Sequence, residues 1–166
     1  EAFVALVAEG AWPDVQLVLV GDYTGDSFLS GYDALRRAAA APALEGRVRF
    51  TGFVPDEDLV HIYNAAAALV LPSFDEGFGL PAVEAMACGT PVIASCAGAL
   101  PEVVGEAGLS FDPHSPRELR ACLEEVLRND SSRLALRERG LRRASEFSWE
   151  KSATIALSVF DALKRE

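Results

Sequence analysis

Short apolar runs and amphipathic segments alternate along the first two thirds of this chain. The apolar runs cover residues 14–21, 47–52, 67–73, 90–95 and 107–113, and they read as strands buried in a parallel sheet. Helical spacing is expected between them, over residues 1–10, 29–44, 55–66, 80–89 and 99–105. Strand and helix therefore alternate down to about Asp112, which predicts an α/β fold with a parallel sheet and helices on both faces.

The last third of the chain reads as helices alone. We expect them over residues 116–128, over residues 132–147, and from Trp149 to the end. Ser115 and Glu118 have the spacing of a reciprocal capping box, with Pro at the first helical position. Ser148 is a suitable cap for the last helix. In the first half, Pro42 is expected to end or kink the helix that precedes it.

Composition and charge narrow the class of protein. The 166 residues, 50% of them hydrophobic, predict one globular domain over residues 1–166. Lys and Arg number 15 against 25 Asp and Glu, and the net charge of −10 argues against nucleic acid or an anionic membrane as the main partner. The three cysteines have neither metal-binding nor secretory spacing, so we expect buried thiols in a reducing compartment.

The start of the chain suggests an incomplete protein. Residues 1–13, "EAFVALVAEGAWP", lack an initiator Met, a basic opening and a signal-peptide cleavage site. They read as the end of an amphipathic helix. We therefore expect the chain to be a piece of a longer protein.

The most unusual loop follows the third predicted strand. Ligands bind beyond the carboxyl ends of strands in open parallel sheets, and this loop contains Gly77 and Gly79 just before a helix. Backbone N–H groups at such a helix start attract a phosphate. Glu84, about one turn into the helix, could accept two hydrogen bonds from a ribose, and Glu76 could accept bonds from a second polyhydroxylated group. Acids near a helix start are also common for dipole reasons alone, so spacing leaves both interpretations open.

The amino-acid sequence of the whole segment is more specific than the spacing of its two glutamates. "PSFDEGFGLPAVEAMACGTPVIAS" resembles the E-x7-E signature of retaining glycosyltransferases with the GT-B fold, the glycosyl transferases of group 1. "LVLVGD", "RVRFTGFVPDEDLVHIYNAAAALVLPS", "PEVVGEAGLSFDP" and "FSWEKSA" resemble that family's C-terminal, nucleotide-sugar-binding half, in the same order. The resemblance covers nearly the whole chain and implies a Rossmann-like sheet with a helical C-terminal segment.

The resemblance assigns roles to matching positions. Glu76 matches the family glutamate that contacts the donor sugar and is needed for transfer, and Glu84 matches the glutamate that binds the nucleotide ribose. The other donor-binding positions that it implies are Gly21, Val54, Gly77, Phe78, Gly79 and Leu80. Among these, Gly21 lets the first loop approach the donor, the main chain near Val54 lies against the base, and the turn from Gly77 holds the sugar and diphosphate.

The resemblance also implies the reaction and its partners. A hexose-type sugar would pass, with retention of configuration and without a metal, from a UDP- or GDP-linked donor to a glycan or lipid-linked glycan. No cofactor is expected beyond this nucleotide-sugar co-substrate. The family's Arg and Lys, and its N-terminal acceptor domain, would precede residue 1, so we expect this fragment to be inactive alone. A cytoplasmic location is expected, with membrane contact only through the missing half.

Other candidate signals point to ordinary structure. Asp56-Glu57-Asp58 contains a D-x-D pattern but opens a helix, so capping is the better interpretation, and His61 and His114 lack a paired ligand, so no metal site is expected. The arginines at 133, 137, 139, 142 and 143 read as a solvated helix face, and the final helix is expected to expose an apolar patch. After the fourth strand relatives often have paired glycines, whereas this chain has only Gly98, which puts the contacts of that loop in doubt.

Two other functions stay open. A sugar-nucleotide epimerase of similar fold would call for different acid and histidine placements. A noncatalytic nucleotide-binding module would bind nucleotide without transfer. The loop at residues 21–32, "GDYTGDSFLSGY", weakly suggests a mannosyl subgroup.

Overall fold

A computed structural model describes residues 1–23 and 31–163. Its strands are β1 (Leu17–Val20), β2 (Val48–Gly52), β3 (Leu69–Leu71), β4 (Val92–Ser95) and β5 (Leu109–Phe111). Its α-helices are α1 (Ala2–Ala8), α2 (Tyr32–Ala39), α3 (Asp56–Ala65), α4 (Leu80–Ala87), α5 (Leu100–Val104), α6 (Pro116–Arg128), α7 (Asp130–Ala144) and α8 (Trp149–Leu163). Short 3-10 turns follow α2 and α5. The alternation of strand and helix predicted from the sequence is confirmed, and α2 ends before Pro42 as expected.

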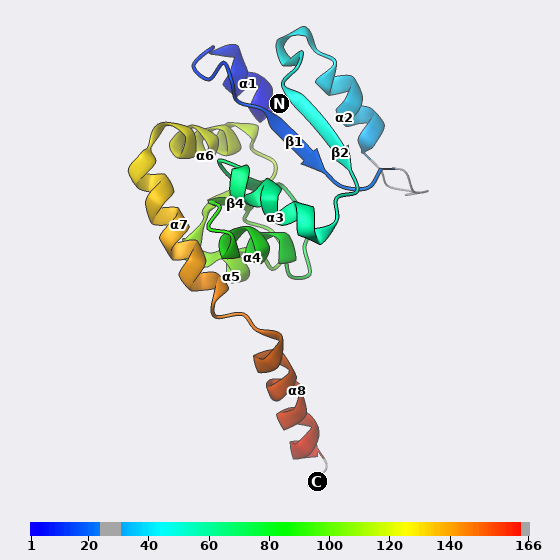
Figure 1. Cartoon of the computed structure of the whole chain (residues 1–166), viewed down its shortest axis with the longest axis vertical. Helices are drawn as coiled ribbons and strands as arrows, with labels where there is room; N and C mark the ends of the chain where they lie inside the picture. Colours follow the sequence, from blue (N-terminus) through cyan, green and yellow to red (C-terminus); the bar gives the residue numbers. More distant parts are fainter. Residues whose placement is uncertain (24–30, 164–166) are drawn as a thin grey trace.

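Every strand pairing is parallel, and in the described part of the chain the strands form two ladders. One joins β1 to β2, and the other has the order β3-β4-β5. Helices pack around both ladders, with α6 and α7 wrapping one side of the body (Figure 1). Parallel strands place all their carboxyl ends at one edge, which is where the predicted ligand loops lie.

The core centres on β4, whose four residues are all buried. One apolar cluster packs α4 against β4 and α5, with Met86 and Leu100 fully buried. A second cluster packs the other side, between β4, β5 and the helices α6 and α7, around Ile93, Val126 and Leu136. A strand covered on both faces is mainly apolar, which explains the apolar run predicted here, and its one polar residue, Ser95, donates a hydrogen bond to the Ser73 carbonyl.

The helix caps follow the sequence closely, with two differences. The Ser115 hydroxyl accepts a hydrogen bond from the Glu118 N–H at 3.3 Å, and Ser148 Oγ accepts one from the Lys151 N–H at 3.1 Å. The Glu118 carboxylate does not complete the reciprocal box, because it accepts from the Asp112 N–H at 2.9 Å instead. Asn129 caps α7, accepting from the Ser132 N–H at 3.0 Å, so this helix begins at Asp130, earlier than predicted.

The expectation of a solvated arginine face on α7 is wrong for Arg133 and Arg143, which are half-buried, whereas Arg137 is exposed but also reaches a neighbouring carbonyl. The Arg143 guanidinium donates to the carbonyls of Glu102 and Val103 at 2.6 and 2.9 Å. Arg137 donates to the Gly89 carbonyl at 3.3 Å, and Arg133 to the Val126 carbonyl at 3.2 Å. These side chains cross to neighbouring elements and satisfy carbonyl groups there.

The cysteines are less buried than predicted. Cys88 and Cys122 are half-buried, Cys96 is exposed, and all three are free thiols. Burial, with a smaller contribution from the Glu118 charge, raises the pKa of the Cys122 thiol. Cys96 is exposed because it lies in the loop that leaves the buried strand β4.

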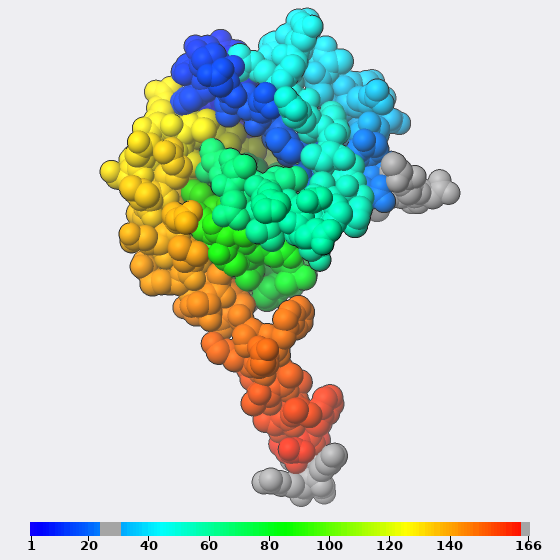
Figure 2. Space-filling view, viewed as in Figure 1, coloured from blue at the N-terminus to red at the C-terminus, as the bar shows by residue number. Residues whose placement is uncertain are grey.

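The last helix, α8, projects from the body (Figures 1 and 2). None of its described residues is buried, and Trp149, Ile155 and Phe160 are 78%, 65% and 60% exposed. The predicted exposed apolar patch on this helix is therefore confirmed.

Candidate functional site

The loop between β3 and α4 carries Glu76 at the carboxyl edge of the sheet. Glu76 is half-buried, and one carboxylate oxygen accepts a hydrogen bond from the Ser73 hydroxyl at 2.9 Å. The Ser95 hydroxyl, at the end of β4, donates to the Ser73 carbonyl at 2.5 Å. The end of the neighbouring strand thus fixes the residue that orients Glu76.

Gly98 holds the same loop from the other side. The Ala99 N–H donates to the Glu76 carbonyl at 3.0 Å. A Cβ added to Gly98 would lie 2.5 Å from the Glu76 nitrogen and 2.7 Å from its oxygen, and Gly98 has φ +57°. The contacts of this loop were in doubt from the sequence, yet its single glycine is the position at which the main chain packs directly on Glu76.

Gly79 begins the helix that follows. It is the N-terminal cap of α4, in the left-handed conformation with φ 93° and ψ 51°, and an added Cβ would lie 2.6 Å from Leu100 Cδ2. Leu80 and Pro81 then begin the helix, where Leu80 keeps a main-chain N–H, Pro81 has none, and the Ala82 N–H donates to the Gly79 carbonyl at 2.9 Å. Around Gly77 an added Cβ would meet nothing within 4 Å, so the loop is open there.

Phe78 is the bulky residue of this turn. Its side chain is 40% exposed, and its ring meets the Phe147 ring edge-on with centroids 5.6 Å apart. The Arg143 guanidinium lies over Phe147, 4.9 Å from the ring centre. The turn is thereby in contact with the segment that joins α7 to α8.

Glu84 lies on the exposed side of α4, in contact with a buried tyrosine. The Tyr63 hydroxyl donates to Glu84 Oε2 at 3.0 Å, while Tyr63 itself is only 6% exposed. The Thr90 hydroxyl donates to the Tyr63 carbonyl at 2.7 Å. Burial first, and then the hydrogen bond and charge of Glu84, raise the pKa of Tyr63, so the phenol stays protonated and remains a donor.

The remaining predicted donor residues lie at the end of the other ladder. Gly21 follows β1, and its N–H donates to the Gly52 carbonyl at 3.2 Å. Val54 is half-buried between β2 and α3. The hydrogen bond of Gly21 joins it to Gly52, not to Glu76 or Glu84. Most of the predicted first loop, residues 24–30, lies outside the described residues.

The acids of the D-x-D pattern and the two histidines occupy positions that are explained by ordinary helix and surface structure. Asp56, Glu57 and Asp58 lie in the first turn of α3 without a side-chain cap bond, so they complement the helix dipole rather than cap it. His61 is exposed, and the exposed His114 packs its ring 4.9 Å from Phe74. Within residues 1–23 and 31–163, no group of three or more His, Cys, Asp or Glu is arranged to hold a metal ion.

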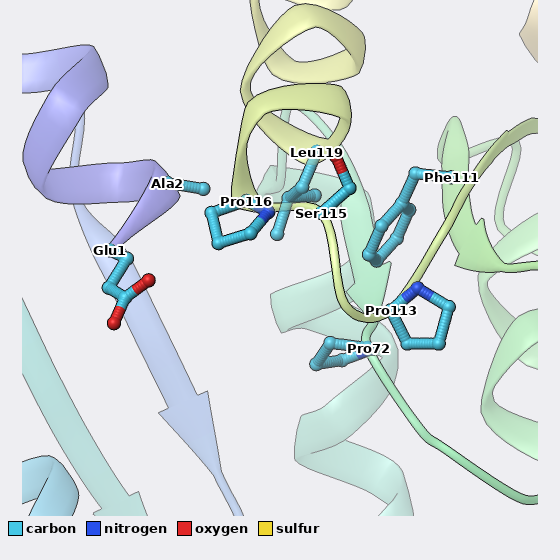
Figure 3. Close-up of a pocket in the computed structure, with 8 residues that line it drawn as sticks. All are labelled: Glu1, Ala2, Pro72, Phe111, Pro113, Ser115, Pro116 and Leu119. Atoms are coloured by element: carbon cyan, nitrogen blue, oxygen red, sulfur yellow. The ribbon is translucent and has the colours of Figure 1, made fainter.

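A separate hollow of about 230 Å³ lies beside the start of α6 (Figure 3). Pro72, Phe111 and Pro113 line it together with Leu119 and the start of α1, so its wall is mainly apolar. It does not include Glu76 or Glu84.

Over the described residues, no helix has the length and apolar character needed to cross a bilayer.

Comparison with known proteins assigns the chain to a family. Residues 1–143 match the model for the glycosyl transferases of group 1, and the chain belongs to that family. It is 45% identical over 140 residues to O-antigen chain mannosyltransferase B of Escherichia coli, covering 81% of this chain and 37% of that protein. It is 36% identical to a D-inositol 3-phosphate glycosyltransferase of Corynebacterium glutamicum, covering 100% of this chain and 40% of that protein. The chain thus spans about two fifths of the length of these relatives.

Solved structures agree with this assignment. Sucrose-phosphate synthase from Thermosynechococcus elongatus matches 99% of this chain with a TM-score of 0.84 and 33% identity, over 42% of its own length. Anabaena HepE, solved in complex with UDP, matches 99% of this chain with a TM-score of 0.78 and 26% identity, over 44% of its length. HepE has also been solved with UDP-glucose. The fold of this chain is the one found in part of these GT-B glycosyltransferases.

Proposed function

We propose that this chain is the donor-binding part of a retaining, metal-independent glycosyltransferase that transfers a hexose from a UDP- or GDP-linked donor to a glycan or lipid-linked acceptor. The observation that carries the proposal is the open turn from Gly77 to Leu80, which enters a helix and is flanked by Glu76 and Glu84. Family membership supports it, as does the binding of UDP and UDP-glucose by the similar HepE.

In this proposal the turn binds the diphosphate. When the bond to the sugar breaks, negative charge builds on the departing diphosphate, and main-chain N–H groups already aimed at it stabilise that charge without rearranging. The positive end of the α4 dipole acts in the same direction. Gly77 gives the phosphate room because no side chain fills the loop there.

Each carboxylate binds a different end of the donor. Glu76 accepts hydrogen bonds from the hydroxyls of the transferred sugar, and Ser73 holds its carboxylate in place. Glu84 accepts hydrogen bonds from the ribose. Gly21 and the main chain near Val54 contribute from the end of the other ladder, the latter beside the base. An N-terminal acceptor domain of the same polypeptide, acting in the cytoplasm, completes the enzyme, and this chain alone does not transfer sugar.

Calorimetry with UDP, GDP and ADP on the full-length protein tests the proposal. One of these nucleotides should bind, and Glu84→Ala should weaken that binding, whereas Glu76→Ala should mainly lower turnover. Binding to none of the three would favour a noncatalytic module. Nucleotide affinity that is unchanged in Glu84→Ala would count against the ribose assignment.

The first donor sugar to assay is mannose. Two of the similar proteins, from Escherichia coli, are named as mannosyltransferases, with 45% and 36% identity to this chain. GDP-mannose and UDP-glucose should therefore be compared directly. Transfer from UDP-glucose alone would overturn the choice of mannose but not the proposed reaction.

A further inference from the structure

We infer that Tyr63 is a positioning residue for the ribose-binding carboxylate, setting Glu84 in the orientation that distinguishes ribose from deoxyribose. The inference rests on the proposed function, in which Glu84 accepts from the ribose hydroxyls. The observation behind it is that the only side chain donating to Glu84, among the described residues, is a buried phenol from a different helix.

The contact has the geometry of a fixed support. Tyr63 lies on α3 and Glu84 on α4, and the two helices pack together. The main chain of Tyr63 is fixed as well, because the Thr90 hydroxyl donates a hydrogen bond to the Tyr63 carbonyl at 2.7 Å. Since Tyr63 is 6% exposed, its ring has little freedom to move away from the carboxylate 3.0 Å from its hydroxyl.

The arrangement divides the two oxygens of Glu84. Oε2 accepts from Tyr63, and in the described part of the chain Oε1 accepts no hydrogen bond. An exposed glutamate otherwise samples many rotamers, and fixing them on ligand binding costs conformational entropy. The bond to Tyr63 restricts those rotamers before the ligand arrives, and it leaves the acceptor capacity of Oε1 for the ligand.

A neutral donor suits this role better than a cation. A lysine or arginine at the same place would compete with the ribose for the carboxylate charge, whereas a phenol donates one hydrogen bond and leaves the charge in place. This contact was not predictable from the sequence, because Tyr63 has the spacing of the apolar positions of α3.

The test compares ribose with deoxyribose in the full-length protein. Calorimetry on wild type should give tighter binding of UDP than dUDP, or of GDP than dGDP, depending on which base binds. Tyr63→Phe should weaken ribonucleotide binding by about three- to tenfold, the effect of leaving one side chain to be ordered on binding. Deoxyribonucleotide binding should change by a smaller factor than ribonucleotide binding, because the deoxy sugar keeps only its 3′-hydroxyl to donate to Glu84. Arg142→Ala, at an exposed position on α7 outside the proposed donor site, should leave both affinities unchanged.

The outcomes separate this inference from the function beneath it. Glu84→Ala should collapse the preference for ribose, and adding Tyr63→Phe to it should have no further effect. If Glu84→Ala leaves the preference intact, the proposed ribose contact fails. If Glu84→Ala removes the preference while Tyr63→Phe weakens both nucleotides equally or neither, only the positioning role is overturned.

A second measurement needs no variant that could fail to fold. With tyrosine labelled at the ring carbon that bears the hydroxyl, the Tyr63 NMR signal should move more when the ribonucleotide binds than when its deoxy analogue does. Equal movement with both nucleotides would contradict the inference.

Discussion

Gly98 and Gly79 allow close packing around the predicted diphosphate turn, Gly98 against the main chain of Glu76 and Gly79 against the Leu100 side chain. Gly98 brings the loop after β4 against the main chain of Glu76, and Gly79 lets α4 begin directly against Leu100. Both have positive φ, a conformation that costs a residue with a side chain energy even where there is space. At each position, close packing adds to that cost.

Gly98→Ala should therefore destabilise the chain more than backbone strain alone would. Gly10 also has a positive φ, +67°, but an added Cβ lies 2.5 Å from the Glu76 nitrogen at Gly98 and meets nothing within 4 Å at Gly10. Urea unfolding should show Gly10→Ala losing about 1 kcal/mol and Gly98→Ala losing about 2–4 kcal/mol. Equal losses would mean that the loop after β4 moves aside without cost.

Tyr63 also makes stability depend on pH in the alkaline range. Its folded-state pKa is raised above the ordinary 10.0, so the protonated phenol is favoured by folding. The corresponding stability is complete below about pH 10 and is lost as pH rises through the folded-state pKa. Urea titrations from pH 9 upward should show a steeper loss in wild type than in Tyr63→Phe. Parallel pH profiles for the two proteins would contradict this cause.

At the scale of the element, α7 is joined to the site by side chains rather than by the sheet. Arg143 donates to two carbonyls at the end of α5, pairs with Glu146, and lies over Phe147, whose ring contacts Phe78 in the turn. A guanidinium can make all these contacts at once because its donors form a planar fork. Since α7 also packs directly on α4, where Gly140 lies against Met86, Arg143 adds a polar link to an apolar contact between the C-terminal helices and the predicted donor site.

Replacing Arg143 with Ala should lower the free energy of unfolding by about 1–3 kcal/mol, because two carbonyls lose their donor. Arg143→Lys should recover only part of the loss, since an ammonium lacks the fork. Arg142, which is exposed on the same helix, provides the matched control, and Arg142→Ala should stay within about 0.5 kcal/mol of wild type. A similar effect of both alanine variants would show that Arg143 acts by charge alone.

The helices and strands were predictable from this sequence because hydrophobic periodicity and capping residues are features of neighbouring positions along the chain. Periodicity located the strands and helices, and Ser115 and Ser148 marked helix starts that the structure shows as capped. Arg143 was misjudged because an arginine on a polar helix face has the same sequence pattern whether it meets water or a carbonyl. The start of α7 was missed by two residues because Asn129 was not recognised as a cap.

At the scale of the whole molecule, the sequence predicted a parallel sheet but not its division into β1-β2 and β3-β4-β5. Strand order depends on which edges meet in space, and short apolar runs carry no information about their neighbours. The same limit applies to the site. Gly77 and Gly79 were visible in the sequence as a candidate turn, whereas the contacts of Gly98 and Tyr63 depend on loops and helices distant along the chain.

The exposed helix α8 makes a prediction for the chain of residues 1–166 in solution. A 15-residue helix with no buried residue has little to stabilise it alone, and it exposes Ile155, Phe160 and Leu163 at 60–65%. Sedimentation equilibrium should show the mass rising above 17.7 kDa with concentration, and more so at high salt, which screens the net charge of −10. The double variant Ile155→Lys/Phe160→Lys should remain at monomer mass, whereas Ser158→Lys on the same helix should behave as wild type. A wild-type chain that stays monomeric at every concentration would show that exposure on α8 alone does not drive association.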